Sequence, residues 1–247
     1  MRGLWKLSWI ELKLFLREPV GAFFTLIFPL MMLLCFGSIY GNRPNPGFGG
    51  YGLVDVSVPA YAAMVVSMGG LFLLTLRVVT YREEHILRRF QPTPVRPEAL
   101  LGAQVLALLL MSVLGMAALV VVGKLGYGLR VDGNPFSIAA AFVLSALGFF
   151  GLGFIIAAVV PTARTALAVV FIAFYPMLFL SGATMPREQL PEAIRHWNQL
   201  LPLTHVVNLL RGLWVGEPWR AHLLEVGVLT GMLALGVLVS AKTFRWD

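Results

Sequence analysis

Long apolar runs, separated by short polar segments, form the main pattern of this chain. Most of the runs approach the roughly 20 residues that an α-helix needs to cross a bilayer, and they are too long for buried strands. A helix also satisfies its backbone hydrogen bonds internally, as lipid requires. The pattern therefore predicts an all-α integral membrane protein with six transmembrane helices. The predicted spans are Val20 to Tyr40, Val58 to Val79, Leu100 to Gly123, Phe136 to Val160, Thr165 to Ser181 and Leu223 to Ala241.

Residues 1–19 form a separate predicted element ahead of a single six-span domain, residues 20–247. When this segment is drawn at 100° per residue, its basic and apolar side chains fall on two faces. One face holds Arg2, Lys6, Lys13 and Arg17, and the other holds Trp5, Trp9, Leu12 and Leu16. This arrangement predicts an amphipathic helix in the membrane interface, with its basic face toward anionic headgroups. The alternative is a basic leader that only sets the topology.

The segment 80–99, between the second and third predicted spans, begins with charged residues and ends with spaced prolines. The prolines are Pro92, Pro94 and Pro97. They favour extended backbone and end any helix by about Phe90, so that a short charged helix is expected from about Tyr81. Such an element could pass force from a cytoplasmic partner into the membrane. The alternative is an ordinary solvated loop.

The segment 182–220, between the last two predicted spans, is too apolar for a solvated loop. It is also too broken by proline to form another span. Its prolines include Pro186, Pro191 and Pro202. We expect two short helices, near residues 188–200 and 203–215, that pack at the outer interface or re-enter the membrane before the last span.

Composition agrees with the span pattern, because 58% of the residues are hydrophobic and only 13% are charged. Soluble domains have about 25% charged residues. With short loops alone left outside the spans, a large soluble catalytic domain is excluded. The net charge of +7 is scattered between apolar runs. Scattered basic residues favour the surface of an anionic bilayer as their partner and disfavour nucleic acid.

The distribution of Lys and Arg predicts the orientation, since these residues are more frequent on the cytoplasmic side. If the first residue is inside, twelve of the nineteen Lys and Arg residues lie on the inner side. They are Arg2, Lys6, Lys13, Arg17, Arg77, Arg82, Arg88, Arg89, Arg96, Arg164, Lys242 and Arg245. We therefore expect a multi-pass protein of the cell (inner or plasma) membrane, with both termini in the cytoplasm.

Several kinds of chemistry have no counterpart in the sequence. ATP hydrolysis would need a phosphate-binding loop ending in Gly-Lys-Ser or Gly-Lys-Thr, but Leu125 follows the Gly123-Lys124 pair. The four histidines, His85, His196, His205 and His222, stand apart from one another. We therefore expect no catalytic residue, no metal and no cofactor in this chain. The near absence of carboxylates at the span centres suits a pathway for an amphiphilic or apolar substrate better than ion-coupled transport.

The order of these parts and several short motifs resemble the membrane subunit of an ABC-2 type exporter. The matching residues are Arg82-Glu83-Glu84, Leu87-Arg88-Arg89, Thr93-Pro94-Val95, Ser181-Gly182, Met185-Pro186, Leu190-Pro191, Leu201-Pro202-Leu203-Thr204 and Leu210-Arg211-Gly212. The resemblance covers essentially the whole chain. Two pairs of residues depart from the family pattern. His85-Ile86 stands where the family commonly has Gly-Thr, and Gln91-Pro92 stands where small residues are usual.

The resemblance implies a permease that works as a dimer, with a second copy of itself or with a homologous permease. Each permease would bind a separate ATP-binding subunit through a coupling helix in segment 80–99. The implied coupling residues are Arg82, Glu83, Glu84, Leu87, Arg88 and Arg89. The implied outer re-entrant motif is Pro202, Thr204 and Arg211. The implied substrates are lipids, drugs and other amphiphiles.

Two other classes of protein remain as alternatives to an exporter subunit. An intramembrane enzyme would need paired polar catalytic groups within the spans. An ATP-independent channel would tend to show a polar or charged line along a span, whereas a membrane scaffold would need neither. An ATP-binding protein that co-purifies with the chain would separate the exporter from these alternatives.

Overall fold

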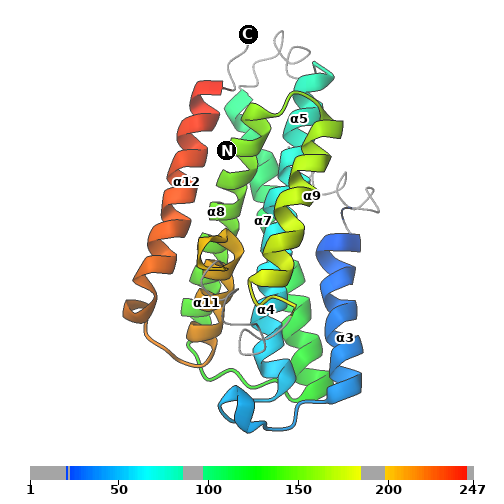
Figure 1. The fold of residues 1–247 in the computed structure, drawn as a ribbon, viewed down its shortest axis with the longest axis vertical. Helices are drawn as coiled ribbons and strands as arrows, with labels where there is room; N and C mark the ends of the chain where they lie inside the picture. Colours follow the sequence, from blue (N-terminus) through cyan, green and yellow to red (C-terminus); the bar gives the residue numbers. More distant parts are fainter. Residues whose placement is uncertain (1–20, 22, 86–96, 185–197, 244–247) are drawn as a thin grey trace.

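The computed structural model describes residue 21 and residues 23–85, 97–184 and 198–243, and this part of the chain is helical with no β-strand. Long helices run side by side along one axis, with α12 at one flank and α3 at the other (Figure 1). The elements are η1 (Phe23–Ile27), α3 (Phe28–Tyr40), η2 (Pro46–Phe48), α4 (Leu53–Ser67), η3 (Met68–Leu74), α5 (Thr75–Glu83), α7 (Pro97–Tyr127), α8 (Pro135–Val159), α9 (Ala163–Leu180), η5 (Asn198–Leu200), α11 (Pro202–Trp214), η6 (Trp219–His222) and α12 (Leu223–Thr243).

Five helical stretches of the described chain are long and apolar enough to cross a membrane. They are Pro46–Glu83, Ala99–Tyr127, Pro135–Val159, Ala163–Leu180 and Trp219–Lys242, and a shorter apolar helix covers Thr25–Tyr40. At 1.5 Å per residue, the 25 residues of α8 extend about 37 Å, which exceeds a hydrocarbon core of roughly 30 Å. The predicted all-α membrane fold is thus confirmed. The number of six spans stays a prediction, because most of residues 1–22 lie outside the described part.

The second predicted span is one continuous helical stretch made of α4, η3 and α5. Its middle, η3, is a π-helix with two glycines. A side chain at Gly70 would place its Cβ only 2.5 Å from the backbone of Phe149 in α8. The glycine therefore lets the two helix backbones approach closely, as small residues do between membrane helices.

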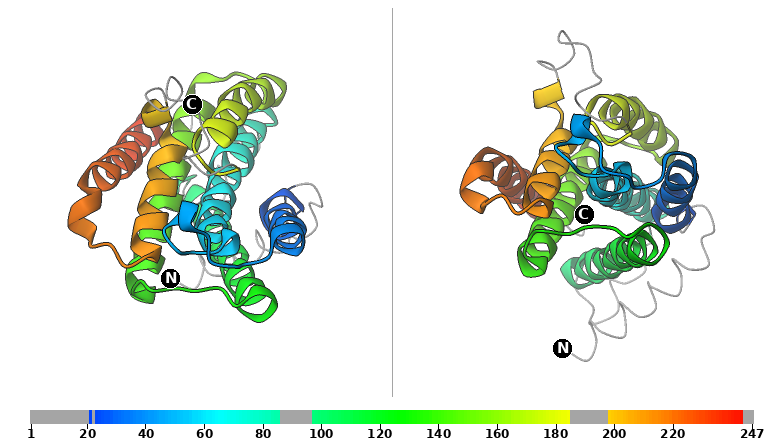
Figure 2. Two further views of the ribbon diagram at one scale, coloured as in Figure 1. Left: turned by 60° about the horizontal axis from the view of Figure 1, so that its bottom comes forward. Right: turned by 90° about the horizontal axis from the view of Figure 1, so that it is seen from below.

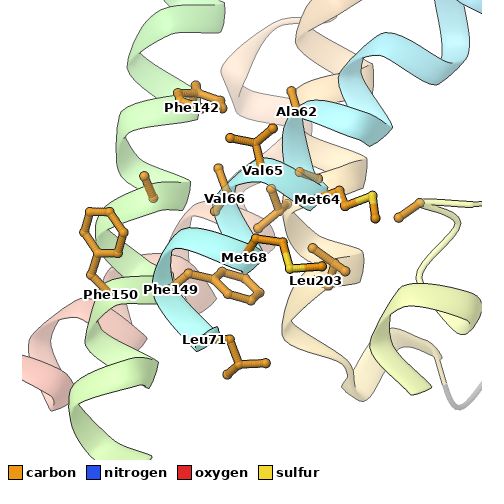
Figure 3. Close-up of a cluster of buried hydrophobic side chains, with 14 of the residues drawn as sticks. Ala62, Met64, Val65, Val66, Met68, Leu71, Phe142, Phe149, Phe150 and Leu203 are labelled. Atoms are coloured by element: carbon orange, nitrogen blue, oxygen red, sulfur yellow. The ribbon is translucent and has the colours of Figure 1, made fainter. Parts of the chain in front are cut away.

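The buried core lies between this stretch and α8, with α11 closing one side (Figure 3). Phe142, Phe149 and Phe150 of α8 face the buried side chains of α4 and η3. Leu203 at the start of α11 completes the cluster. The helices that surround the core keep apolar side chains on their outer faces, which suits contact with lipid.

α12 packs along α8 through a pair of glycines, Gly236 and Gly151. A Cβ on Gly236 would lie 2.2 Å from the Cα of Gly151. The two helices therefore touch backbone to backbone at this level. In the view along the bundle axis, α12 and α3 lie on opposite sides of the helix bundle (Figure 2).

The segment before the last span contains the second of the two expected short helices. α11, with 13 residues, is about 20 Å long and therefore too short to cross a bilayer. Its position agrees with the prediction for residues 203–215. The first expected helix, near residues 188–200, lies mostly outside the described residues, of which Asn198–Leu200 form a short 3-10 turn.

The structure corrects two boundaries around segment 80–99. The helix expected to start near Tyr81 does not begin there, because residues 81–83 are the last turn of α5, which ends at Glu83. α7 begins at Pro97, which was expected to be extended. Proline suits the first helical position, where its missing N–H costs no hydrogen bond. The amphipathic helix expected in residues 1–19 and the segment 86–96 lie outside the described residues.

Candidate functional site

Charged and polar side chains gather at the two ends of the bundle. At one end, α5 stops and α8 passes into α9, and we call it the Glu83 end (Figure 1). At the other end, α3 passes into α4 and α7 into α8, and we call it the Asp55 end. Of the coupling residues expected from the resemblance, Arg82, Glu83 and Glu84 lie at the first end. Of the outer motif, Arg211 lies in a cavity wall at the second end.

At the Glu83 end, two of the predicted coupling residues bind the turn between α8 and α9. The guanidinium of Arg82 donates hydrogen bonds to the carbonyl oxygens of Ala158, at 3.5 Å, and of Val160. The Oε2 atom of Glu83 accepts a hydrogen bond of 2.7 Å from the backbone N–H of Ala163. The last turn of α5 is therefore fastened to both helices that meet in this turn.

The signs of these two charges match the helix ends that they contact. The last carbonyls of a helix and its first N–H groups lack partners within the helix. They also carry the negative and positive ends of the helix dipole. The cation of Arg82 meets the end of α8, and the anion of Glu83 meets the start of α9, where the hydroxyl of Thr162 caps a second N–H.

The other predicted coupling residues divide into described and undescribed ones. Glu84 is exposed at the end of α5, and His85 follows with a φ of 54°. A positive φ is uncommon for a residue with a side chain and is typical of glycine after a helix. Leu87, Arg88 and Arg89 lie outside the described residues.

At the Asp55 end, a buried carboxylate joins three segments. Asp55, in the first turn of α4, is 2% exposed. Its carboxylate accepts hydrogen bonds from the side-chain amide of Asn42 at 2.8 Å, from the N–H of Gly52 at 2.9 Å and from the N–H of Arg130 at 2.9 Å. Because Asn42 and Arg130 belong to the loops after α3 and after α7, this one side chain holds both loops against the start of α4.

The same network continues to the end of α11. The indole N–H of Trp214 donates to the carbonyl oxygen of Arg130 at 3.0 Å. In return, the N–H groups of Asp132 and Gly133 donate to the carbonyl oxygen of Trp214, at 3.2 and 2.9 Å. The buried polar groups of this hydrogen-bond network therefore have partners, as is usual for buried polar groups in stable proteins.

The three residues of the predicted outer motif all belong to α11. Pro202 is its first residue. Thr204 is fully buried, and its hydroxyl has no hydrogen-bond partner among the described residues. Arg211 donates to the carbonyl oxygens of Val56, at 3.1 Å, and of Gly182, at 3.5 Å. Arg211 thereby ties α11 to α4 and to the segment after α9.

A cavity of about 570 Å³ lies at the Asp55 end, between the η2 loop, α4, α11 and the start of α12. His222 in its wall places Nε2 2.9 Å from a carboxylate oxygen of Glu217, and Nδ1 3.9 Å from one of Glu225. No group of three or more His, Cys, Asp or Glu side chains in the described part of the chain is placed to hold a metal ion.

A second, more apolar pocket of about 210 Å³ lies between η3, α9 and the segment before α3. Its wall is aromatic. The ring of Phe72 meets those of Phe171 and Phe174 edge to face, at centroid distances of 5.1 and 5.0 Å. Tyr175 stacks on Phe171 at 5.6 Å. The half-exposed ring of Tyr175 continues this aromatic wall onto the outer face of α9.

Reasoning from the sequence missed the Asp55 network. A signal was present, because Asp55 stands three residues after Gly52, at the start of an apolar run. An acidic residue at that spacing often reaches back to the N–H at the start of a helix. The partners Asn42 and Arg130 are distant in the sequence, and no local pattern points to them.

A family profile described as "ABC-2 type transporter" matches residues 2–214 of this chain. The chain belongs to the ABC-2 type transporter family. This finding confirms the resemblance drawn from the motifs, and with the apolar helices it makes the chain a multi-pass membrane permease.

Several curated relatives match parts of this chain. Nodulation protein J of Rhizobium leguminosarum bv. viciae is 34% identical over 102 residues, which are 41% of this chain and 39% of the relative. ABC transporter G family member 20 of Dictyostelium discoideum is 25% identical over 211 residues, 81% of this chain and 28% of the relative. The probable multidrug ABC transporter permease YbhR of Escherichia coli (strain K12) is 21% identical over 160 residues, 65% of this chain and 44% of the relative. Each match thus covers less than half of the relative's length.

Proposed function

We propose that this ABC-2 permease forms the translocation pathway of an exporter for amphiphilic or lipid-like substrates and is driven by a separate ATP-binding subunit. Two permeases, either two copies of this chain or one copy and a homologue, would complete the pathway. The segment with Arg82, Glu83, Glu84, Leu87, Arg88 and Arg89 would couple the permease to the ATP-binding subunit, with the direct contact made by Leu87, Arg88 and Arg89. The family membership and the relatives named as ABC transporters support this assembly.

The observation that carries the substrate class is the aromatic pocket beside α9. Aromatic rings give large apolar contact at low cost in side-chain entropy, and they accept flat or aliphatic groups of varied shape. The pocket lining contains Thr25 and Tyr175 as polar groups and no charged side chain. An amphiphile with an apolar body matches such a wall better than an ion does. The E. coli relative, named as a probable multidrug permease, supports the same substrate class.

The proposed orientation places the Glu83 end in the cytoplasm and the Asp55 end outside. The excess of Lys and Arg on the side of segment 80–99 supports it. Cys35 is the sole cysteine of the chain, so replacing it with alanine gives a background for single labels. In that background, Glu84→Cys should react with a membrane-impermeant maleimide only from the cytoplasmic side, and Asn45→Cys only from outside. The reverse pattern would overturn the orientation.

The function itself is tested by purifying the tagged chain in mild detergent and reconstituting it with any ATP-hydrolysing subunit that accompanies it. We expect uptake of a rhodamine dye into inverted vesicles that requires ATP. Phe72→Ala removes one ring from the proposed binding wall. It should raise the dye concentration for half-maximal transport by about two- to tenfold, the size of one aromatic contact between protein and dye. Val113→Ala, on the exposed face of α7, is the matched control and should change it by less than about twofold.

Two results would contradict the proposal. One is purification of the chain without ATPase activity, together with dye movement that is the same with and without ATP; this result would favour a channel or a scaffold. The other is ATP-dependent transport in which Phe72→Ala and Val113→Ala behave alike, which would move the pathway away from the aromatic pocket.

A further inference from the structure

The last turn of α5 precedes residues 86–96 in the sequence, which we call the coupling segment, and it contacts α8 and α9. Glu83 is bonded to the first N–H of α9, and Arg82 to the last carbonyls of α8. Both side chains belong to the residues that the family resemblance connects with the ATP-binding subunit. Because of these hydrogen bonds, a displacement of the last turn of α5 would also displace the turn between α8 and α9.

α8 is tied to the α4–α5 stretch at other levels as well. The hydroxyl of Thr75, at the start of α5, donates to the carbonyl oxygen of Gly153 in α8 at 3.2 Å and lies 3.4 Å from that of Gly70. A Cβ on Gly153 would lie 2.3 Å from the carbonyl oxygen of Gly70, so the backbones are in contact. α5 and α8 are therefore held together from the middle of the bundle to the Glu83 end.

α9 is attached to the same stretch in a different way. Along its length, it meets η3 through the rings of Phe171 and Phe174 against Phe72. These contacts join side chains, whereas Gly70 and Gly153 bring the backbones of η3 and α8 together. At its first residue, the hydrogen bond from Ala163 to Glu83 joins α9 to α5. Phe171 lies roughly 12 Å further along the helix, at 1.5 Å per residue.

We infer that Arg82 and Glu83 form a clamp that converts displacement of the coupling segment into tilting of α9, and thereby into a change in the aromatic pocket. In this arrangement Arg82 holds α5 to α8, which acts as the fixed support. Glu83 pulls on the start of α9, which is the moving wall. Both are positioning residues, and neither needs to touch substrate. The inference rests on the proposed function, because it assumes that the coupling segment is displaced by an ATPase.

The test compares Glu83→Ala with the neighbouring Glu84→Ala in the reconstituted complex. Both remove one carboxylate from an exposed position, but only Glu83 binds α9. We expect Glu83→Ala to lower the number of dye molecules exported per ATP by up to about fivefold, the size expected for losing an exposed charge at a helix end. The co-purified amount of ATPase subunit and its basal turnover should stay within about twofold. Glu84→Ala should keep the wild-type ratio.

A conservative variant separates clamping from a merely structural role. Glu83→Gln keeps an oxygen that accepts from Ala163, so it should recover most of the export ratio. A fall in thermal stability with an unchanged ratio would mean that Glu83 only caps α9, and this would overturn the inference. Loss of the ATPase subunit in Glu83→Ala would also overturn it, because Glu83 would then be a docking contact. If Glu83→Ala fails to fold, Arg82→Ala tests the other half of the clamp and should show the same loss; an unchanged ratio there would overturn it.

A distance measurement distinguishes failure of the clamp from failure of the proposed function. In the Cys35→Ala background, spin labels at His85→Cys and Arg164→Cys report the gap between the end of α5 and the start of α9. Adding Glu83→Ala should broaden this distance distribution, whether or not the complex exports dye. An unchanged distribution would overturn the clamp, whereas a broadened one in a complex without ATP-dependent export would overturn only the proposed function.

Discussion

The two ends of this bundle are closed by different kinds of interaction. At the Asp55 end, a carboxylate that is 2% exposed accepts three hydrogen bonds from three segments, and the end of α11 joins the same network. At the Glu83 end, an exposed carboxylate accepts one bond from one helix, and Arg82 binds the carbonyls beside it. Both ends hold loops in place, but only one does so with a buried charge.

This difference has an energetic consequence. A buried carboxylate that loses its partners, or donors that lose the carboxylate, cost about 1–3 kcal/mol for each unsatisfied group. Exposed charges at helix ends contribute only about 0.3–1 kcal/mol. The Asp55 end is therefore a rigid closure, and the Glu83 end is an adjustable one. This difference suits the proposed function. A partner would displace the helices at the adjustable Glu83 end, while the rigid Asp55 end keeps their other ends in place.

The largest expected effect is that of Asp55→Ala. It leaves the amide of Asn42 and the N–H groups of Gly52 and Arg130 without their acceptor, and we expect a loss of about 4 kcal/mol in the free energy of unfolding. Glu83→Ala makes the same type of change at the other end and should cost under about 1 kcal/mol. Unfolding in mixed dodecylmaltoside and SDS micelles, followed by tryptophan fluorescence, measures both. Equal losses would remove the distinction between the two ends.

The sequence was sufficient to predict most of the helices, because each one is a long apolar run bounded by polar or proline residues. The boundaries predicted for the fourth and fifth spans differ from those of α8 and α9 by one or two residues. The contacts between segments could not be predicted in the same way. Gly151 of α8 and Gly236 of α12 bring the two backbones into contact. In the sequence, nothing distinguishes either glycine from the other small residues of its span.

For the candidate site too, the sequence indicates individual residues but not their contacts with other segments. The motifs named Arg82 and Glu83 as coupling residues, and this assignment stays a prediction. They did not show that α8 ends and α9 begins beside these two side chains. Arg211 was likewise identified, without its acceptor in α4. Asp55 was missed because two of its partners, Asn42 and Arg130, come from loops distant in the sequence. In each case the sequence shows the charged residue, but it does not show the partner that the fold brings beside it from another segment.

A second, smaller effect is expected at Gly133, in the loop between α7 and α8. A Cβ there would lie 1.8 Å from the carbonyl oxygen of Leu213, which is a steric clash, so Gly133→Ala must push α11 away from the loop. We expect a cost of about 2–3 kcal/mol, within the range for overpacked sites. Gly126→Ala, at the end of α7, meets no atom within 4 Å and is the control. If the two variants unfold alike, the Asp55 end is less rigid than its contacts indicate.

The smallest effect is expected at the Glu83 end and has the opposite sign. His85 follows α5 with a φ of 54°, and its N–H donates to the carbonyl oxygen of Arg82 at 3.1 Å, as at a helix end that glycine commonly occupies. A left-handed conformation costs a residue with a side chain roughly 1–2 kcal/mol, and glycine avoids this cost. Glycine also loses more conformational entropy on folding, which cancels part of the gain. His85→Gly should therefore stabilise the protein by about 0.5–1 kcal/mol in the same unfolding assay. His85→Ala keeps the Cβ and should give no such gain. If alanine stabilises as much as glycine, the benefit comes from losing the imidazole, and the backbone of the adjustable end carries no strain at His85.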